Sequence, residues 1–221
     1  MDITLQIIAV CRRLDQLGFV PATDGNVSVR LSKDEIMITP TMVPKRALQQ
    51  SQLLVVGMDG RVRQGTGRPL DSARGRPSSE MKMHLTAYWL RPDVNAIVHA
   101  HPPVATGFAT ARQGLTEPVL PESVLTLGPV PLAQYATPST GEVAKSIEKL
   151  IIMHNALLLA NHGVLTVGST LDEAMERMER VEHLAKVTLV AALLGGAKTL
   201  SASDIAKIKA AYQQPDTGTQ A

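Results

Sequence analysis

The sequence contains very little cysteine and no basic leader. Cys11 is the single cysteine among 221 residues, which excludes a disulfide within the chain. Its position on an apolar helical face indicates simple packing in a reducing compartment, so we expect a cytoplasmic protein. The first 18 residues carry Asp2, Arg12, Arg13 and Asp15 and do not resemble a signal peptide.

Long apolar runs and an excess of one charge are also missing. No segment reaches the roughly 20 uncharged apolar residues that a membrane span requires, so we expect no membrane partner. Lys and Arg number 22 against 20 Asp and Glu, a formal net charge of +2. This balance does not predict the basic surface typical of nucleic-acid binding, and a small molecule is the favoured partner.

The apolar content indicates one folded domain. Hydrophobic residues make up 44% of the chain, which is enough for one sizeable core. The last periodic segment ends near residue 212 and is followed by the polar stretch "QQPDTGTQA". We expect one domain over residues 1–212 and a flexible tail over 213–221.

Periodicity predicts helices that alternate with groups of strands. Apolar spacings of three and four residues predict helices over 2–17, 79–90, 102–111, 139–151, 170–194 and 201–212. Alternating or β-branched runs predict strands over 26–31, 35–40, 53–62, 95–101 and 156–168, the last broken at 161–163. We expect Ser78 to cap the second helix, residues 63–77 to form a loop and 117–138 to be extended. This order predicts an α/β fold with a mixed sheet covered by helices.

Two histidines stand one residue apart in "IVHAHPP". Because alternate residues of a strand point to the same face, the rings of His99 and His101 converge. Two such imidazoles can bind one Zn²⁺ at about 2.0–2.1 Å when a third ligand arrives from elsewhere. His162 is the best candidate, at a predicted corner where Gly163 lets the backbone turn. Shared coordination requires its ring to come within about 6 Å of the pair.

Three histidines without a cysteine cluster favour a catalytic zinc site with one open position. Three imidazoles also suit other divalent transition metals, so the identity of the metal stays open. The alternative is that these are hydrogen-bonded core residues, as a single histidine in a strand usually is. The histidines at 84, 154 and 183 lack this spacing and are interpreted as structural or surface groups.

Two polar segments are suited to an anion. In "PSSE", the N–H groups of a first helical turn and the hydroxyls of Ser78 and Ser79 would cradle a phosphate, although a capped helix start explains the same residues. In "TDGNVS", Gly25 permits close backbone approach, while Thr23 and Asn26 supply donors. A turn before a strand explains this second segment equally well.

Six short motifs occur in order along the chain. They are "GNVSVR" at 25–30, "ITPT" at 38–41, "PSSE" at 77–80, "RPDVNAIVHAH" at 91–101, "YATPST" at 135–140 and "NHG" at 161–163. Each is weak alone, but six in this order and spacing are specific. Together they resemble the class II aldolase and adducin-head family, most closely its L-fuculose-phosphate aldolase branch. The resemblance runs from about Thr4 to Tyr212.

The resemblance implies a metal site, a phosphate site and an assembly. Zn²⁺ would be bound by His99, His101 and His162, while Glu80 matches the catalytic acid/base that also contacts the metal before substrate binds. Phosphate would be held by Thr23, Gly25, Asn26, Thr41, Ser78 and Ser79. Tyr212 matches a C-terminal catalytic tyrosine contributed across a subunit boundary. The implied fold has three layers, with a central mixed, largely antiparallel sheet between helices, and the implied assembly is a homotetramer.

The implied reaction is cleavage of a ketose 1-phosphate of the fuculose-phosphate type to dihydroxyacetone phosphate and an aldehyde. Zn²⁺ would stabilise the enediolate left when the carbon–carbon bond breaks, and Glu80 would move the proton at the carbon next to the carbonyl. The alternative is a related reaction on a phosphorylated sugar or oxo-acid, either decarboxylation, 4-epimerisation or dehydration. A non-catalytic scaffold similar to the adducin head is disfavoured by the complete set of metal ligands.

Two positions depart from the aldolase pattern. Met42 follows "ITPT" where the pattern usually has glycine, so one backbone approach to the phosphate is expected to be lost or reshaped. The segment 117–127 lacks the tyrosine that the aldolase branch usually carries there, and Glu122 lies near that point. These departures concern the aldehyde partner more than the metal chemistry.

Overall fold

The computed structural model describes residues 2–65 and 76–213 of the chain. Most of the predicted loop at 63–77 lies outside the described residues, and so does the predicted tail beyond residue 213. Gln213 itself belongs to the last helix rather than to a tail.

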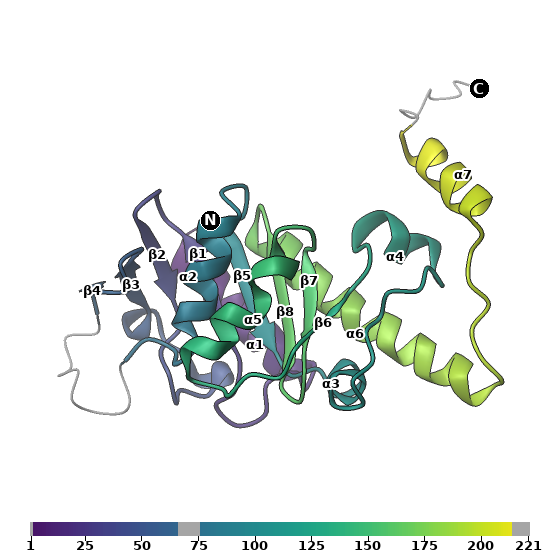
Figure 1. Ribbon diagram of the computed structural model, residues 1–221. Helices are drawn as coiled ribbons and strands as arrows, with labels where there is room; N and C mark the ends of the chain where they lie inside the picture. The colour runs from purple at the N-terminus through teal and green to yellow at the C-terminus, as the bar shows by residue number, and fades with distance from the viewer. Residues whose placement is uncertain (1, 66–75, 214–221) are drawn as a thin grey trace, which may run out of the picture.

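Strands of the described chain form one central sheet (Figure 1). They are β1 (Asn26–Arg30), β2 (Glu35–Ile38), β3 (Leu54–Gly57), β4 (Val62–Gln64), β5 (Ala96–Ala100), β6 (Leu132–Ala133), β7 (Ala156–Leu159) and β8 (Gly163–Gly168). Their order across the sheet is β4-β3-β2-β1-β5-β8-β7-β6. Every neighbouring pair is antiparallel except β6 and β7, which confirms the predicted mixed, largely antiparallel sheet.

Helices cover both faces of this sheet. They are α1 (Ile3–Gln16), α2 (Met81–Leu90), α3 (Pro103–Thr110), α4 (Pro121–Thr126), α5 (Gly141–Ile151), α6 (Leu171–Leu193) and α7 (Ala202–Gln213), with short 3₁₀ turns at Lys45–Ala47 and Gln50–Gln52. Side chains of α1, α3 and α6 share one core with the sheet, and those of α2 and α5 share the other. Figure 1 shows α2 and α5 lying in front of the sheet. The predicted three-layer α/β arrangement is confirmed.

Alternation along β5 decides which layer each of its side chains meets. Ala96, Val98 and Ala100 pack in the core beneath α1, α3 and α6, whereas Ile97 packs beneath α2 and α5. His99 follows Ile97 by two residues, so it points toward the layer that contains α2. This register places a fully buried imidazole under the start of that helix.

The helix α2 begins two residues later than predicted. Its N-cap is Glu80 rather than Ser78, and no side chain caps it. Pro77 pairs with Pro40 in an isolated bridge, and the Ser78 N–H donates to the carbonyl of Thr39 at 3.3 Å. Because this tertiary pairing holds the chain extended at 77–78, the helix starts only after a turn closed by the N–H of Met81.

The prediction of an extended segment over 117–138 is wrong for Pro121–Thr126, which form α4. Proline at the first helical position has its φ already set for a helix, and α4 packs against α6 and α7. Within the rest of this segment, Leu132–Ala133 form the short edge strand β6, parallel to β7. Tertiary packing therefore overrides the weak local preference here.

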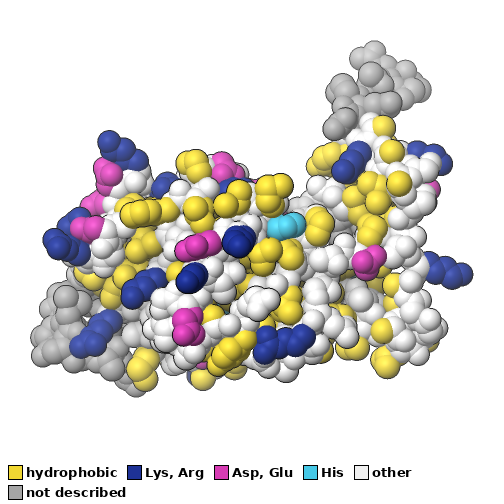
Figure 2. Space-filling model, viewed as in Figure 1, with side chains coloured by type: hydrophobic (Ala, Val, Ile, Leu, Met, Phe, Trp, Pro, Cys, Tyr) yellow, Lys and Arg dark blue, Asp and Glu magenta, His cyan; other side chains and the backbone are white. Residues whose placement is uncertain are grey.

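Exposed apolar side chains gather on three parts of the surface. The end of α6 exposes Leu189 (43%), Val190 (54%), Leu193 (79%) and Leu194 (81%), and in Figure 1 it extends past the sheet. The space-filling view shows further apolar side chains over α2 and α5 and on α7 (Figure 2). None of the described helices is both long and apolar enough to cross a membrane.

Candidate active site

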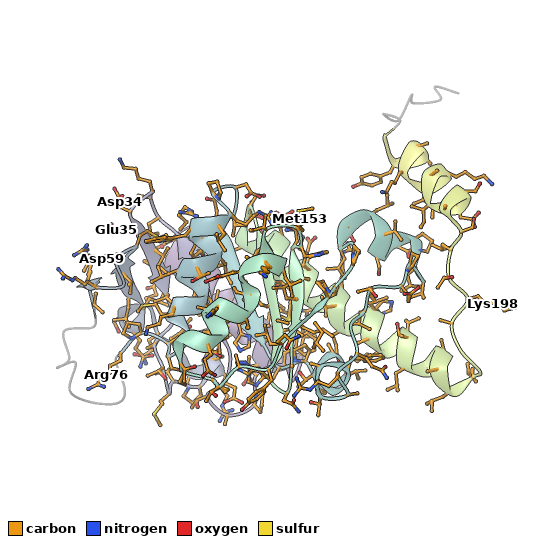
Figure 3. The ribbon with its side chains drawn as sticks, viewed as in Figure 1. Asp34, Glu35, Asp59, Arg76, Met153 and Lys198 are labelled. Carbon is orange, nitrogen blue, oxygen red and sulfur yellow. The ribbon has the colours of Figure 1, made fainter. Side chains whose placement is uncertain are left out.

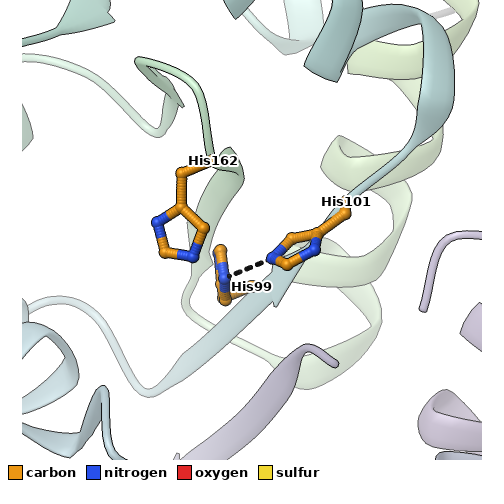
Figure 4. Close-up of side chains that lie close together, drawn as sticks. All are labelled: His99, His101 and His162. Atoms are coloured by element: carbon orange, nitrogen blue, oxygen red, sulfur yellow. Dashed lines mark hydrogen bonds between the residues drawn. The ribbon is translucent and has the colours of Figure 1, made fainter. Parts of the chain in front are cut away.

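Three imidazole rings meet at the end of β5 (Figure 4). His99 lies in β5, His101 directly follows this strand, and His162 lies in the turn between β7 and β8. Their candidate ligand nitrogens all lie within 4.8 Å of one another. The ring centroids are between 4.7 and 5.1 Å apart. The predicted convergence of the three rings is confirmed.

The backbone of the β7–β8 turn brings His162 to the other two rings. Asn161 adopts the left-handed region with a φ of 55°, which asparagine tolerates better than most residues. A Cβ atom on Gly163 would lie 2.6 Å from the carbonyl oxygen of Ala100 and 2.6 Å from Cδ2 of His101. The left-handed turn residue is therefore Asn161, and Gly163 is required for close approach rather than for the turn itself.

The carboxylate of Glu80 faces the rings from the start of α2. Its Oε2 lies 3.0 Å from Nε2 of His99, and its Oε1 lies 3.0 Å from Nε2 of His162. Burial opposes the ionisation of this group, but attraction to His99 and His162 outweighs burial and holds the pKa of Glu80 below its ordinary value. Glu80 is therefore ionised at neutral pH.

The inward-facing atoms of this cluster fit a metal ion. Nε2 of His101 and Nε2 of His99 face each other at 3.1 Å, and two ring nitrogens at this distance require a proton or a cation between them. Oε1 of Glu80 is buried and accepts no hydrogen bond of good geometry, despite its short distance to His162. Three imidazole nitrogens and one carboxylate oxygen form a donor set that Zn²⁺ and similar ions bind.

Polar groups on the outer side contact two of the rings. Nδ1 of His99 lies 2.9 Å from the carbonyl oxygen of Val164, and Nδ1 of His101 lies 3.3 Å from Oδ2 of Asp24. With a metal ion bound, donation from Nδ1–H would leave Nε2 unprotonated and direct its lone pair at the shared point. Burial and repulsion from His99 and His162 lower the pKa of His101 to about 3. This ring is therefore neutral, as a metal ligand must be.

A cavity of about 300 Å³ opens beside the histidines. It is lined by Thr23, Asp24, Gly25, Asn26, Pro40, Thr41, Met42, Ser78, Ser79, Glu80, His101, Pro138, Ser139 and His162. All six residues predicted to hold phosphate belong to this set, although they come from three separate segments of the chain. Lys and Arg are absent from this described lining, so its hydrogen-bond donors near the opening are mostly uncharged.

Some of these residues also contact Glu80 and the strand that carries the histidines. Nδ2 of Asn26 donates to Oε2 of Glu80 at 2.9 Å, and Oγ of Ser78 accepts from the N–H of Glu80 at 3.3 Å. Gly25 has a φ of 74°, and a Cβ atom there would lie 2.9 Å from the carbonyl oxygen of His99. Glycine is therefore required where this loop passes the strand that carries the histidines.

Four residues of the cavity were not predicted from the sequence, namely Asp24, Pro40, Pro138 and Ser139. Strained backbone is a signal that only the structure reveals. Among described residues other than glycine, positive φ values at or beside the cavity occur at Ala22, Met42, Ser139 and Asn161. Residues in sparsely populated conformations cluster at binding sites, because the surrounding structure holds them there.

The two departures from the aldolase pattern have different outcomes. Met42 lines the cavity with a φ of 56° and a 52% exposed side chain, in a conformation that glycine adopts without strain. Glu122 is exposed on α4 and does not line the cavity.

Tyr212 is 71% exposed on α7 and lines a separate hollow with residues of α4 and α6. Within one chain, Tyr212 is not brought to the histidines.

The chain is similar to known proteins over most of its length. A family model described as Class II Aldolase and Adducin N-terminal domain matches residues 5–189. The L-fuculose phosphate aldolase of Escherichia coli strain K12 is 32% identical over 206 residues, covering 92% of this chain and 90% of that protein.

Solved structures show the same fold. A structure of L-fuculose 1-phosphate aldolase matches with a TM-score of 0.85 and 30% identity, covering 96% of this chain and 97% of that chain. YgbL of Klebsiella pneumoniae, whose reaction is given as aldolase, epimerase or decarboxylase, matches with a TM-score of 0.81 and 27% identity, covering 93% and 97% of the two chains. These matches confirm the resemblance drawn from the six motifs and the prediction that the protein is an enzyme of the class II aldolase type. The chain belongs to the Class II Aldolase and Adducin N-terminal domain family.

Proposed function

We propose that the protein is a zinc-dependent class II aldolase that cleaves a ketose 1-phosphate of the fuculose-phosphate type to dihydroxyacetone phosphate and an aldehyde. One observation carries the proposal. Three imidazole nitrogens and the carboxylate of Glu80 meet at a cavity whose lining also carries the hydroxyl groups of Thr41, Ser78 and Ser79. Similarity to L-fuculose phosphate aldolases over most of the chain supports the same reaction.

The proposed metal ligands are His99, His101 and His162, with Glu80 as a further ligand before substrate binds. The chemistry that Zn²⁺ supplies when bound is Lewis-acid stabilisation of the negative charge on an enediolate. The hydrogen bond from His99 to Val164 and the carboxylate of Asp24 beside Nδ1 of His101 favour the tautomer that this role requires in two of the ligands.

The proposed role of Glu80 is to carry the proton at the carbon next to the substrate carbonyl. Its ionised state suits a base. Oε2 already accepts a hydrogen bond from Asn26, whereas Oε1 accepts none, so Oε1 is the oxygen available to take up a proton. Burial of the carboxylate at 8% exposure limits competition from water.

The proposed phosphate site consists of Thr23, Gly25, Asn26, Thr41, Ser78 and Ser79. Their common position around one cavity supports this role, because hydroxyl and backbone N–H groups are frequent phosphate donors. Positive charge lies behind two of the cavity loops. The buried ammonium of Lys45 donates to the carbonyl oxygens of Thr23 at 3.0 Å and Val43 at 3.2 Å.

We further propose a single cytoplasmic domain over residues 1–212 that assembles into a homo-oligomer, with a tetramer favoured. The exposed apolar side chains at the end of α6 support assembly, because their burial between chains is favourable. In such an assembly, Tyr212 would act in the site of a neighbouring chain, which is consistent with its exposure on α7. Light scattering of the purified protein gives the number of chains.

The test of the reaction is a panel of ketose 1-phosphates, including fuculose 1-phosphate, incubated with zinc-loaded protein. Release of dihydroxyacetone phosphate is followed by a coupled reduction, and zinc is measured in the same sample. We expect release by the unaltered protein and a fall in kcat of about 10²–10⁴-fold in Glu80→Gln. A zinc-containing protein that released no dihydroxyacetone phosphate from any member of the panel would refute the proposal.

The second candidate is another reaction on a phosphorylated substrate: decarboxylation of an oxo-acid, 4-epimerisation or dehydration. Two observations keep this candidate open: Met42 lines the cavity where the aldolase pattern usually has glycine, and the similar YgbL is described as an aldolase, epimerase or decarboxylase. Carbon dioxide release from phosphorylated oxo-acids, compared between the unaltered protein and Met42→Gly, distinguishes it from aldol cleavage. A chain that assembled stably yet bound no zinc would instead indicate a scaffold.

A further inference from the structure

Four buried polar side chains lie in a row behind Glu80, and the proposed proton transfer makes no direct use of three of them. Asn26 and Ser28 point to one face of β1, and His84 and Tyr88 lie one helical turn apart on α2. Their exposed fractions are 4% for Asn26, 0% for Ser28, 0% for His84 and 1% for Tyr88. Such a buried set is stable only when its members satisfy one another.

Hydrogen bonds join these side chains into one unbranched chain that ends at Glu80. Nδ2 of Asn26 lies 2.9 Å from Oε2 of Glu80, and Nε2 of His84 lies 2.5 Å from Oδ1 of Asn26. Oγ of Ser28 lies 2.6 Å from Nδ1 of His84 and 2.9 Å from the hydroxyl of Tyr88. Each ring nitrogen of His84 therefore has one partner.

The carboxylate of Glu80, at the end of this row of hydrogen bonds, fixes the direction of every bond in the row. An ionised carboxylate only accepts, so Asn26 must turn its NH₂ group to Glu80 and its carbonyl oxygen to His84. His84 must then donate from Nε2. Burial lowers the pKa of His84 to about 3, so the ring is neutral and its Nδ1 accepts from Ser28. The Ser28 oxygen in turn accepts from Tyr88, and all the hydrogens point toward Glu80.

His84 restricts the orientation of the side-chain amide of Asn26. A primary amide can rotate by half a turn, which would place its carbonyl oxygen against the carboxylate and repel it. The N–H of His84 prevents this rotation, because it would then face the NH₂ group of Asn26. In the other tautomer of His84, Nδ1–H would donate to Ser28 and Ser28 would donate to Tyr88, so the buried hydroxyl of Tyr88 would lose Ser28 as its acceptor.

We propose that His84 is a positioning residue: through Asn26 it holds the carboxylate of Glu80 in one orientation, with Oε2 bound and Oε1 free for proton transfer. The proposal rests on the catalytic role proposed above for Glu80. It also gives Asn26 a second task besides lining the phosphate cavity.

Two different substitutions of His84 test the proposal. In His84→Gln the side-chain amide can still donate to Asn26, whereas His84→Leu removes the donor. We expect kcat to fall about 10–100-fold in His84→Leu with KM changed less than about 3-fold, and His84→Gln to recover kcat to within about 5-fold of the unaltered protein. Equal losses in the two variants, or an unchanged kcat in His84→Leu, would overturn the proposal.

Folding and zinc content are measured on the same samples by thermal unfolding and elemental analysis. If His84→Leu does not fold, Ser28→Ala serves instead, because it removes the donor that fixes the tautomer of His84 without touching Asn26. We expect Ser28→Ala to keep its zinc and to lower kcat about 3–10-fold. An unchanged kcat in this variant contradicts the proposal.

Two readouts do not depend on catalysis. In the unaltered protein labelled with ¹⁵N-histidine, the nitrogen shifts of His84 should be those of the Nε2–H tautomer, and the Nδ1–H tautomer would contradict the proposal. In crystals, the carboxylate of Glu80 should be rotated in His84→Leu and unmoved in His84→Gln. If the unaltered protein cleaves no ketose 1-phosphate, the proposed function fails, while these two measurements still decide whether His84 positions Glu80.

Discussion

Oδ2 of Asp24 lies 3.3 Å from Nδ1 of His101, on the side of the ring that faces away from the other two histidines. A carboxylate in this position fixes the tautomer of a metal-binding histidine and makes its inner nitrogen a stronger donor. Asp24 comes from the loop before β1, and His101 comes from the end of β5. The pairing of these two strands brings the two groups together.

Replacement of Asp24 should therefore weaken metal binding. We expect Asp24→Ala to lower the affinity for zinc about 10-fold, and Asp24→Asn to lie between it and the unaltered protein, because its carbonyl oxygen still accepts a hydrogen bond. Competition with a chromophoric chelator measures the affinity. Asp34→Asn is the control, since Figure 3 places this exposed residue at the edge of the molecule near β2. Equal affinities in Asp24→Ala and the control would show that Asp24 has no part in the site.

Removal of any one of the three clustered imidazoles should abolish stoichiometric metal binding. We expect about one zinc per chain in the unaltered protein and much less in His99→Ala, His101→Ala or His162→Ala, because two remaining imidazoles hold the ion weakly. Elemental analysis after gel filtration measures it. His183→Ala, an exposed histidine on α6, should keep its zinc. Full zinc content in all three site variants would mean that the ion binds elsewhere.

Lys45→Met should weaken phosphate binding without removing the metal. Lys45 is 1% exposed, and its ammonium donates to the carbonyls of Thr23 and Val43, so its charge lies behind a cavity whose described lining has no Lys or Arg. We expect inorganic phosphate to compete with substrate about 5–10-fold less well. Inhibition constants measure this effect. Lys33→Met, an exposed lysine between β1 and β2, is the control, and an equal change in both variants would point to a long-range charge effect.

Glu182→Ala should destabilise the segment that follows His101. Oε2 of Glu182 accepts from the N–H groups of Val104 and Ala105 at 3.1 and 2.9 Å, in the first turn of α3, and Glu182 is 2% exposed. We expect a loss of about 1–3 kcal/mol in the free energy of unfolding, because one buried and one partly buried donor lose their acceptor. Urea unfolding in the presence of a chelator measures it.

Glu179→Ala is the matched control on the same helix. Glu179 pairs with Arg13 at the surface, and such pairs contribute less than about 1 kcal/mol. A loss in Glu182→Ala no larger than in this control would contradict the capping role.

Acid should loosen the loop at 137–140 through Glu142. This carboxylate accepts from the N–H of Thr137, and this hydrogen bond holds the pKa of Glu142 below its ordinary value. A lowered pKa means that the stabilisation is present above the ordinary pKa of 4.5 and is lost as the pH falls through the lowered value.

Hydrogen exchange at Thr137, corrected for its intrinsic rate, measures the effect. Protection should fall with acid in the unaltered protein and in Glu148→Gln, an exposed control on the same helix. In Glu142→Gln, protection should already be low at pH 6 and should depend little on pH. Equal protection in all three proteins would exclude this role for Glu142.

Local patterns were sufficient for most of the elements. Helices over 2–17, 139–151 and 170–194 were predicted within two residues of α1, α5 and α6, because a continuous apolar stripe and a capping residue mark them. The structure departs from the prediction at α4 and in the cap and start of α2. The start of α2 depends on the bridge between Pro40 and Pro77, and α4 depends on packing against α6 and α7, so neither is encoded within its own segment.

Motif order and the two-residue period of a strand are local properties, so they were enough to predict the family, the fold class and the face shared by His99 and His101. The contacts of the site depend on distant segments: His162 and Glu80 lie against this pair, Asp24 lies beside His101, and Asn26 is bound to both His84 and Glu80. These groups are separated by tens of residues, and only the pairing of strands and the packing of α2 on the sheet place them within hydrogen-bonding range.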